Sequence, residues 1–298
     1  MRYADPHMLN VECVVHYQLT EDIEGWAMDE CLACPRLCGV DRRLEAGYCK
    51  APWNPVIASV MVHRGEEAVI SGSRGSGTVF FAGCNLGCVF CQNHDISHSC
   101  DGKEVAAPEL AEIFLRLEIQ RVHNVNLVTP SHFVYPIADA IKLAKSKGIG
   151  IPFVYNSNGY DAIPSLQMME GLIDIYMPDL KYIGEAHSRR YSDAPDYFSV
   201  ASMALKEMYR QVGAASVVDG VMQKGVLIRH LVMPGLGGDS FAVLDWIKDN
   251  LPSALVNVMP QYRPEYRARE FREINRRPTA SEYRAVTAYL RELGLGEC

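Results

Sequence analysis

FFAGCNLGCVFCQNHDIS, residues 80–97, is the stretch that decides which fold and which chemistry we expect of this chain. It places Cys84, Cys88 and Cys91 at intervals of four and three, directly after an apolar run that predicts a strand. In folds of parallel strands and helices, active sites lie in the loops that follow the carboxyl ends of the strands. Three thiolates can ligate three irons of a [4Fe-4S] cluster, whereas structural clusters have four cysteine ligands. The spacing therefore predicts a cluster with one iron left open for another ligand.

Short apolar runs alternate with segments of helical periodicity from residue 78 onward. The apolar runs predict six buried strands, at residues 78–83, 124–129, 150–156, 172–179, 225–232 and 254–260. Helices are predicted at residues 107–122, 133–147, 161–170, 195–212, 239–251 and 279–293. Continuous apolar strands are typical of a parallel sheet covered by helices. Six units fall short of the eight in a closed barrel, so residues 76–298 are predicted to form a partial (β/α)6 TIM-type barrel of the α/β class.

Residues 1–75 are predicted to form an N-terminal cysteine-rich, metal-binding extension. The stretch CLACPRLCGVDRRLEAGYC (31–49) contains four cysteines, namely Cys31, Cys34, Cys38 and Cys49. Four thiolates so close together suit either a tetrahedral zinc site or a fully ligated [4Fe-4S] cluster, and both alternatives stay open. An irregular segment of this length has little core of its own, so we expect it to depend on its metal. Further along, residues 56–71 predict two strands around a turn at residues 64–66.

Composition and charge restrict the class of protein. Of the 298 residues, 48% are hydrophobic and 22% charged, which is typical of a globular protein with a large core. The net charge of -7 makes nucleic acid or an anionic membrane an unfavourable partner. No apolar run approaches the roughly 20 residues that cross a bilayer, and the first residues lack the pattern of a signal peptide. We therefore expect a cytoplasmic protein, in which clustered cysteines indicate metal ligands rather than disulfides.

One segment has a charge opposite to that of the whole chain. Residues 262–279 contain six arginines and three glutamates. Such a segment is commonly solvated and laced with salt bridges. Alternatively, it is a patch that receives an acidic substrate or partner. Both interpretations stay open at this point.

The stretch CNLGCVFC (84–91) resembles the C-x3-C-x2-C signature of radical SAM enzymes, including the aromatic Phe90 before the third cysteine. The resemblance implies that the open iron chelates the amino and carboxylate groups of S-adenosylmethionine (SAM). It also implies that one electron from the cluster breaks the sulfonium bond to give a 5′-deoxyadenosyl radical. An electron donor of the flavodoxin or ferredoxin type is implied as a partner. SAM then supplies the chemistry, and the protein supplies orientation and shielding.

The likeness is strongest to the activating enzymes of glycyl-radical proteins, such as the pyruvate formate-lyase activating enzyme. Three further stretches at predicted strand ends carry it: NSNG (156–159), MPDLK (177–181) and IRHLVMPG (228–235). The resemblance implies that the SAM site is lined by Asn156, Ser157, Asp179, Lys181 and Arg229, together with Phe90. Lys181 and Arg229 have the charge to bind the SAM carboxylate. The alternative is a ring of polar strand ends with ordinary capping hydrogen bonds.

Two stretches depart from the activating-enzyme pattern. Where those enzymes have Gly-Gly-Glu, whose carboxylate accepts the SAM amino group, this chain has VTPSH (128–132). Thr129, Ser131 and neutral His132 are then the acceptors that we expect at this position. Where those enzymes have a His after the sixth strand, this chain has Gln261 and Tyr262. Both departures bear on the substrate rather than on SAM cleavage.

Three hypotheses follow for the function. The first is a radical SAM oxidoreductase that abstracts hydrogen from a protein or peptide, for example from a backbone glycine. The second is a radical SAM enzyme that modifies a small molecule or another macromolecule. The third is a zinc-binding module without catalysis. The pairing of two cysteine groups in the related family favours iron–sulfur over zinc at Cys31, Cys34, Cys38 and Cys49.

Overall fold

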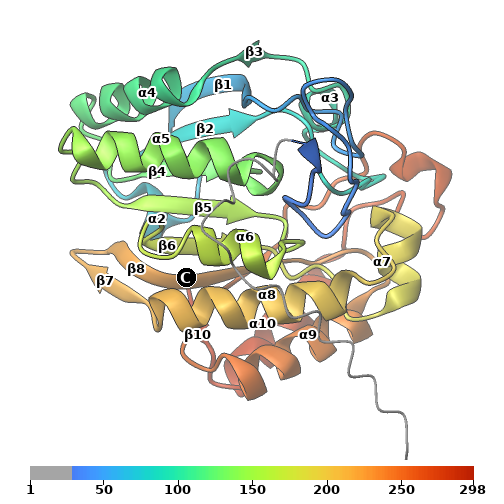
Figure 1. Ribbon diagram of the computed structural model, residues 1–298. Coiled ribbons are helices and arrows are strands. Elements are labelled where there is room, and N and C mark those ends of the chain that lie inside the picture. Colours follow the sequence, from blue (N-terminus) through green and yellow to red (C-terminus); the bar gives the residue numbers. More distant parts are fainter. Residues whose placement is uncertain (1–28) are drawn as a thin grey trace, which may run out of the picture.

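A computed structural model of the protein describes residues 29–298, so residues 1–28 of the predicted extension lie outside the described part. The described strands form one sheet in the order β10-β9-β8-β6-β5-β4-β2-β1-β3, with β7 paired to β8 beside this path (Figure 1). The strands are β1 (Val56–His63), β2 (Ser76–Phe81), β3 (Lys103–Glu104), β4 (Val125–Val128), β5 (Phe153–Ser157), β6 (Ile175–Pro178), β7 (Ser216–Val218), β8 (Val221–Leu231), β9 (Leu255–Met259) and β10 (Gly296–Glu297).

Six parallel strands form the centre of the sheet and confirm the six predicted strands and the α/β class. Strands β2, β4, β5, β6, β8 and β9 pair in this order, each parallel to the next. Strand β1 pairs antiparallel with β2 and with β3 at one edge, and β10 adds a parallel strand at the other. Within residues 29–298 the edge strands β3 and β10 do not pair with each other. The sheet is therefore open, as expected of a partial barrel.

All six predicted helices are present between or after these strands. The helices are α2 (Ala68–Ser71), α3 (His94–Ser97), α4 (Ala107–Ile119), α5 (Val134–Ser146), α6 (Ile163–Met168), α7 (Glu185–Ser192), α8 (Tyr197–Val212), α9 (Gly237–Asn250) and α10 (Ala280–Glu292), with 3-10 turns η1 (Ser131–Phe133) and η2 (Ala268–Glu270). Helices α4, α5, α6 and α8 cover one face of the sheet (Figure 1). Their buried faces repeat at helical spacing, as in α8 with Ala201, Ala204, Leu205 and Met208. This spacing produces the main hydrophobic core between helices and sheet.

The opposite face of the sheet, here called the inner face, carries alternate residues of each strand. On β5, Phe153 and Tyr155 belong to the main core, whereas Val154 belongs to a second cluster. That second cluster joins Ile70 of α2 to Ile175, Met177 and Leu227 of the sheet. Because side chains in register point to the same side, Asn126 and Asn156 also lie on the inner face. The inner face is thus covered by α2 at one end and is polar further along the strands.

The predicted pair of strands at residues 56–71 is wrong in its second half. Residues 56–63 form β1, but residues 68–71 form α2, and β1 pairs with β2 instead. The turn of helix is held because Ile70 is fully buried against the inner face, and its carbonyl accepts a hydrogen bond from Asn124 at 2.8 Å. Tertiary contacts here outweigh the strand preference of Val69 and Ile70. The predicted domain boundary after residue 75 lies at the start of β2 and stays a prediction.

No helix among residues 29–298 is both long enough and apolar enough to cross a bilayer.

Candidate active site

The loop after β2 carries the three cysteines of the predicted cluster. Cys84, Cys88 and Cys91 lie between β2 and α3, and all three are free thiols that are partly exposed. The loop is held by contacts with α7, since the Gly87 and Val89 amides donate to the carbonyl oxygens of Ser192 and Tyr191 at 3.0 and 2.9 Å. Helix α7, which the sequence did not predict, therefore supports the loop.

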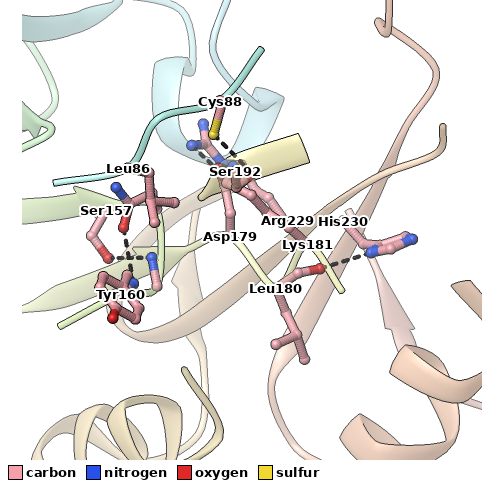
Figure 2. Close-up of polar contacts among 12 residues, drawn as sticks. Leu86, Cys88, Ser157, Tyr160, Asp179, Leu180, Lys181, Ser192, Arg229 and His230 are labelled. Atoms are coloured by element: carbon pink, nitrogen blue, oxygen red, sulfur yellow. Dashed lines mark hydrogen bonds and ion pairs between the residues drawn. The ribbon is translucent and has the colours of Figure 1, made fainter. Parts of the chain in front are cut away.

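Each thiol has a polar neighbour from a different part of the fold. The Sγ of Cys88 lies 3.1 Å from the hydroxyl of Ser192, as Figure 2 shows. The Sγ of Cys91 lies 3.2 Å from the hydroxyl of Ser97. The Sγ of Cys84 accepts from Nδ2 of Asn158 at 3.5 Å. Hydrogen bonds to the sulfurs are one means by which proteins tune iron–sulfur clusters.

Asp179, directly after β6, joins the carboxyl ends of three strands. Its carboxylate lies 2.5 Å from Nζ of Lys181 and 2.9 Å from Nη2 of Arg229 on β8 (Figure 2). The Arg229 guanidinium also donates to Oδ1 of Asn156 on β5 at 2.7 Å. Burial by itself would raise the pKa of Asp179, but the two cations outweigh it and hold the pKa below its usual value. The carboxylate is therefore charged, and Lys181, whose pKa is raised despite its burial, is charged with it.

Tyr197 of α8 fixes the backbone on which this ion cluster rests. Its hydroxyl lies 2.8 Å from the carbonyl oxygen of Asn158 and 2.9 Å from that of Asp179. The same hydroxyl accepts from the amide of Lys181 at 3.1 Å. Between these strand ends, Gly159 has a φ of 82°, and a Cβ there would lie 2.2 Å from the Asp179 carbonyl oxygen. The ends of β5 and β6 can approach this closely only because residue 159 is glycine.

The site thus combines three thiols of one loop with a partly buried ion cluster at strand carboxyl ends. A family model described as the radical SAM superfamily matches residues 78–244, more than half of the chain. This chain belongs to the radical SAM superfamily. A relative from Methanocaldococcus jannaschii, "Uncharacterized protein MJ0674", is 31% identical over 292 residues, which cover 95% of this chain and 78% of the relative. Membership of the superfamily implies an enzyme with a [4Fe-4S] cluster and SAM.

Two solved structures support the same fold at low sequence identity. A radical SAM methyltransferase from Sphaerobacter thermophilus matches with a TM-score of 0.52 and 12% identity, over 74% of this chain and 65% of that one. The structure "Native anSMEcpe with bound AdoMet" matches with a TM-score of 0.51 and 13% identity, over 72% of this chain and 61% of that one. This chain therefore spans less than two thirds of either structure, and the likeness establishes the fold alone.

The cysteine loop fits the cluster that the radical SAM superfamily implies. Its donors are three soft thiols from one loop. That loop packs closely on residues 29–55, here called the N-terminal segment, and two of its glycines have no room for a side chain. A Cβ at Gly87 would lie 2.5 Å from the hydroxyl of Tyr48, and one at Gly83 would lie 2.6 Å from the carbonyl oxygen of Cys49. A pocket of about 310 Å³ opens beside this loop, lined by Tyr48, Lys50, Cys84, Leu86, Gly87, Ser97 and His98.

Cys84 and Cys88 are held as protonated thiols until a metal binds. Burial raises the pKa of Cys84 to about 12 and that of Cys88 to about 11. Lys181 acts in the opposite direction on Cys88, because its positive charge favours the thiolate. Since thiolates are the iron ligands, cluster assembly must release protons.

The three residues after β4 that were expected to accept from SAM differ in exposure, and their predicted roles toward SAM stay predictions. Thr129 is partly exposed with a φ of 61°, whereas Ser131 and His132 are each only 1% exposed. Nε2 of His132 lies 2.8 Å from the carbonyl oxygen of Ala82, and its own carbonyl accepts from Arg42. Burial and the nearby Arg42 lower the pKa of His132 to about 3, so the imidazole is neutral. His132 thus links the end of β2 to the N-terminal segment.

Ser157 and Phe90 have partners of their own within the fold. The hydroxyl of Ser157 donates to Oδ2 of the buried Asp161 at 2.7 Å and accepts from the Gly159 amide at 3.1 Å. The ring of Phe90 is 5% exposed, and its centroid lies 5.7 Å from that of Tyr262. Ser157 therefore holds the turn after β5, and Tyr262 packs where the activating enzymes carry a His. The predicted roles of both residues toward SAM stay predictions.

The structure adds a residue that the sequence did not indicate. Glu66, between β1 and α2, reaches the inner face, where Oε2 lies 3.8 Å from Nη1 of Arg229. Its neighbour Glu67 accepts from Nδ2 of Asn257 on β9 at 2.8 Å. Burial raises the pKa of Glu66. No sequence signal could have found Glu66, because its place depends on α2, where a strand was predicted.

The second cysteine group lies in the irregular segment before β1. Cys31, Cys34 and Cys49 are buried and Cys38 is partly exposed. Burial raises the pKa of Cys34 to about 12, and the other three thiols add to the effect, so the four lie within electrostatic range of one another. As the side chains stand among residues 29–298, no three His, Cys, Asp or Glu groups converge on a single metal-ion position. Zinc and iron–sulfur at this group both stay predictions.

The N-terminal segment packs directly on the cysteine loop. Nε of Arg36 donates to the carbonyl oxygen of Asn85 at 2.8 Å, and its guanidinium lies 3.7 Å from the ring centroid of Tyr48. The hydroxyl of Tyr48 donates to Oδ2 of Asp193 at 2.8 Å, which ties the segment to the end of α7. The amide of Tyr48 in turn donates to Sγ of Cys38 at 3.3 Å. The two cysteine groups are therefore joined by a short chain of contacts.

Proposed function

We propose that this radical SAM enzyme generates a 5′-deoxyadenosyl radical that abstracts a hydrogen atom from a protein or peptide substrate. When bound, the [4Fe-4S] cluster supplies the electron that cleaves SAM reductively. Cys84, Cys88 and Cys91 would hold the cluster. The observation that carries the proposal is the ion cluster of Asp179, Lys181 and Arg229 at the strand ends beside Cys88 (Figure 2).

The ion cluster can bind and orient the charged end of SAM. Lys181 influences the pKa of Cys88, so its ammonium lies within electrostatic range of the loop. A carboxylate that arrives there would compete with Asp179 for Lys181 and Arg229. Both cations can form charge-assisted hydrogen bonds with either carboxylate. Asp179 keeps both cations in place before SAM binds. Partial burial of the Asp179, Lys181 and Arg229 side chains limits their contact with water and strengthens each of these interactions.

Hydrogen abstraction from a protein glycine is the substrate chemistry that we favour. It is supported by the resemblance of the stretches at 156–159, 177–181 and 228–235 to the activating enzymes of glycyl-radical proteins. A small molecule or another macromolecule is the second candidate. It is favoured by the stretch at 128–132, which replaces the acidic acceptor of the activating enzymes. There His132 is buried and contacts the carbonyl oxygen of Ala82. The non-catalytic zinc module is not proposed, since superfamily membership implies an enzyme.

For the second cysteine group we propose an auxiliary [4Fe-4S] cluster, with zinc as the alternative. The proposal is supported by the contact chain from Cys38 through Tyr48 and Arg36 to Asn85, the residue after Cys84. A second iron–sulfur cluster could exchange electrons with the main cluster over this short distance, whereas zinc would only stabilise the segment.

Anaerobic reconstitution with iron and sulfide tests the proposed activity. With dithionite and SAM, the wild-type protein is expected to produce 5′-deoxyadenosine, measured by chromatography. Cys88→Ala should abolish the product and the cluster absorbance, while Cys298→Ala, outside both cysteine groups, should retain them. A folded wild-type protein with an intact cluster and no 5′-deoxyadenosine would contradict the proposal.

The substrate class needs a separate measurement. Candidate glycyl-radical proteins are added to the reduced enzyme with SAM, and a glycyl radical is sought as a doublet by EPR. A doublet that requires Cys88 supports activation of a protein. Hydrogen transfer from a small molecule into 5′-deoxyadenosine, followed with deuterated substrate, would favour the second candidate instead.

A further inference from the structure

An arginine-rich surface lies beside the cysteine loop. Six arginines are exposed along the segment that follows β9: Arg263, Arg267, Arg269, Arg272, Arg276 and Arg277. Three of them pair with a carboxylate, namely Arg263 with Glu265, Arg267 with Glu270 and Arg276 with Glu282. For Arg269, Arg272 and Arg277 no ion pair is formed with any residue between 29 and 298. In a chain of net charge -7, this surface is a local positive region with charge free for a partner.

The segment that bears these arginines is packed on the cysteine loop itself. The Arg267 amide donates to the carbonyl oxygen of Val89 at 2.9 Å, between the second and third cysteines. Nε2 of Gln92 donates to the carbonyl oxygen of Gln261 at 2.9 Å. In Figure 1 this orange-red loop lies beside α3. A partner bound to the arginines would therefore lie next to the predicted cluster.

Tyr266 connects the arginine surface to a cysteine through stacked rings. The residue is 37% exposed, and its ring centroid lies 4.7 Å from that of His98 with the planes 22° apart. It also stacks on His94 at 5.0 Å. Nε2 of His98 lies 3.4 Å from the carbonyl oxygen of Cys88. The contacts thus run without a gap from an exposed aromatic ring to the backbone of a cluster ligand.

We propose that this surface, Arg269, Arg272 and Tyr266 above all, is the docking and electron-entry site for a small acidic one-electron donor protein. The proposal rests on the proposed function, because reductive SAM cleavage needs one electron delivered to the cluster. A donor that carries a reduced flavin or iron–sulfur group loses one electron, and the oxidised cluster gains it, with no bond made or broken in the transfer. Acidic side chains of the donor pair with the unpaired arginines, and its cofactor faces Tyr266.

Charge complementarity favours such a donor over an acidic peptide substrate at this place. The stacked rings lead to the Cys88 carbonyl, whereas the ion cluster of Asp179, Lys181 and Arg229 approaches the loop from the strand ends. A substrate must reach the strand ends, where SAM would bind. An electron donor needs only a short path to the cluster, and the surface around Tyr266 provides it. Opposite charges would also steer the encounter and raise the association rate.

The test compares a protein donor with a small reductant on the reconstituted enzyme. The variant is Arg269→Glu/Arg272→Glu, and the control is Lys224→Glu/Lys248→Glu, which makes the same charge change at exposed sites on β8 and α9. Cluster reduction by a reduced acidic flavodoxin is followed by stopped-flow absorbance at low ionic strength. We expect the second-order rate constant to fall about tenfold or more in the arginine variant and to change little in the control. At about 0.5 M salt the difference should shrink, because screening shortens the electrostatic range.

Dithionite separates this proposal from the proposed function. With dithionite, wild type and arginine variant should reduce their clusters and produce 5′-deoxyadenosine equally. Loss of both activities in the wild type would contradict the proposed function, whereas equal flavodoxin rates in variant and wild type would overturn the docking site. A variant that accepts electrons normally but loses turnover of an acidic substrate would also overturn it, in favour of a substrate surface.

A second variant tests the path through Tyr266. Tyr266→Leu removes the ring that stacks on His98, and Tyr266→Phe retains it. At saturating flavodoxin, the limiting rate of cluster reduction should fall at least tenfold in Tyr266→Leu and stay near the wild-type rate in Tyr266→Phe. Equal limiting rates in all three proteins, with cluster absorbance intact, would overturn the role of this residue.

Discussion

Asp179 is the residue on which the order of the strand ends depends. It is the anion for two partly buried cations, Lys181 and Arg229, and all three side chains are between 13% and 17% exposed. Arg229 has a further contact, since Glu66 lies 3.8 Å from it. Removing Lys181 therefore leaves Asp179 paired with Arg229, whereas removing Asp179 leaves the Lys181 ammonium without its anion.

The asymmetry predicts different stability losses for two isosteric changes. Asp179→Asn should lower the free energy of unfolding by about 3 kcal/mol, because it removes the anion and leaves the Lys181 charge without its partner. Lys181→Met should lower it by about 1 kcal/mol, because Asp179 keeps Arg229. Lys147→Ala, which breaks the exposed pair with Glu112, should change it by at most about 0.5 kcal/mol. Urea unfolding measures all three, and equal losses for Asp179→Asn and Lys181→Met would contradict this account.

Glu66 predicts a dependence of stability on pH. Burial raises its pKa in the folded protein above 4.5, so folding favours the protonated acid. Stability contributed by this group is complete below pH 4.5 and is lost as the pH rises through the folded pKa. Glu66→Gln removes that loss, so its stability relative to wild type should increase with pH across this window. Chemical denaturation at a series of pH values measures the trend, and the same change at an exposed carboxylate, Glu185→Gln, is the control.

At the scale of elements, the turn after β5 depends on Gly159, and Gly171 offers a matched control for its substitution. Gly159 and Gly171 both have left-handed backbones, with φ of 82° and 75°, but only a Cβ at Gly159 would meet other atoms. Gly171→Ala should cost about 1–2 kcal/mol from backbone conformation. Gly159→Ala should cost about 1–3 kcal/mol more, because the Cβ would press on the Asp179 carbonyl. Urea unfolding of both variants gives the difference, and its absence would show that the strand ends can separate freely.

The central elements could be predicted from the sequence because their patterns are set by burial alone. Six apolar runs became six parallel strands, and helix α8 kept the buried face expected from its spacing. Helix α2 and helix α7 could not be predicted. The apolar residues of α2 suit a strand equally well, and only the inner face of the sheet selects a helix. Helix α7 is short and polar, with two arginines in its last turn, so it has no apolar periodicity to reveal it.

The residues of the candidate site likewise fall into those that the sequence indicated and those that only the structure reveals. Residues on strand ends, such as Asp179 and Arg229, were indicated by motif and position, and the fold places them in contact. Ser192 and Glu66 carried no signal, because their places depend on α7 and on the turn into α2. The sequence also could not reveal the contacts of His132 with Arg42 and Ala82, and its predicted role toward SAM stays a prediction. Motifs give residue types, and the tertiary contacts decide where each one points.

At the scale of the whole molecule, the N-terminal segment and the sheet form one unit. Arg42 is 3% exposed and donates to the carbonyl oxygens of Ala51, Pro52 and His132, which joins the segment to the residues after β4. Ser165 of α6 adds a hydrogen bond to the carbonyl oxygen of Ala33 at 2.8 Å. The segment that carries the second cysteine group is thus anchored at both sides of the cysteine loop. Its metal should therefore affect the stability of the segment without being needed for the main cluster.

Metal content of cysteine variants tests this independence. Cys34→Ala removes a buried ligand of the second group, while Cys84, Cys88 and Cys91 keep their own contacts with Asn158, Ser192 and Ser97. We expect the variant to keep the main cluster and its 5′-deoxyadenosine production with dithionite. Elemental analysis should show a loss of about four iron atoms per chain, since a [4Fe-4S] cluster with four cysteine ligands needs all of them.

Loss of one zinc per chain instead would assign a structural zinc to this group, because zinc sites of this kind are tetrahedral with four thiolates. In that case, a chelator should unfold the segment around Arg36 and Tyr48 before the sheet, since structural zinc contributes directly to folding. Limited proteolysis between residues 31 and 49 would detect the difference. Simultaneous loss of both metal sites in Cys34→Ala would contradict the independence argued from these contacts, because the segment would then be part of the main cluster's own support.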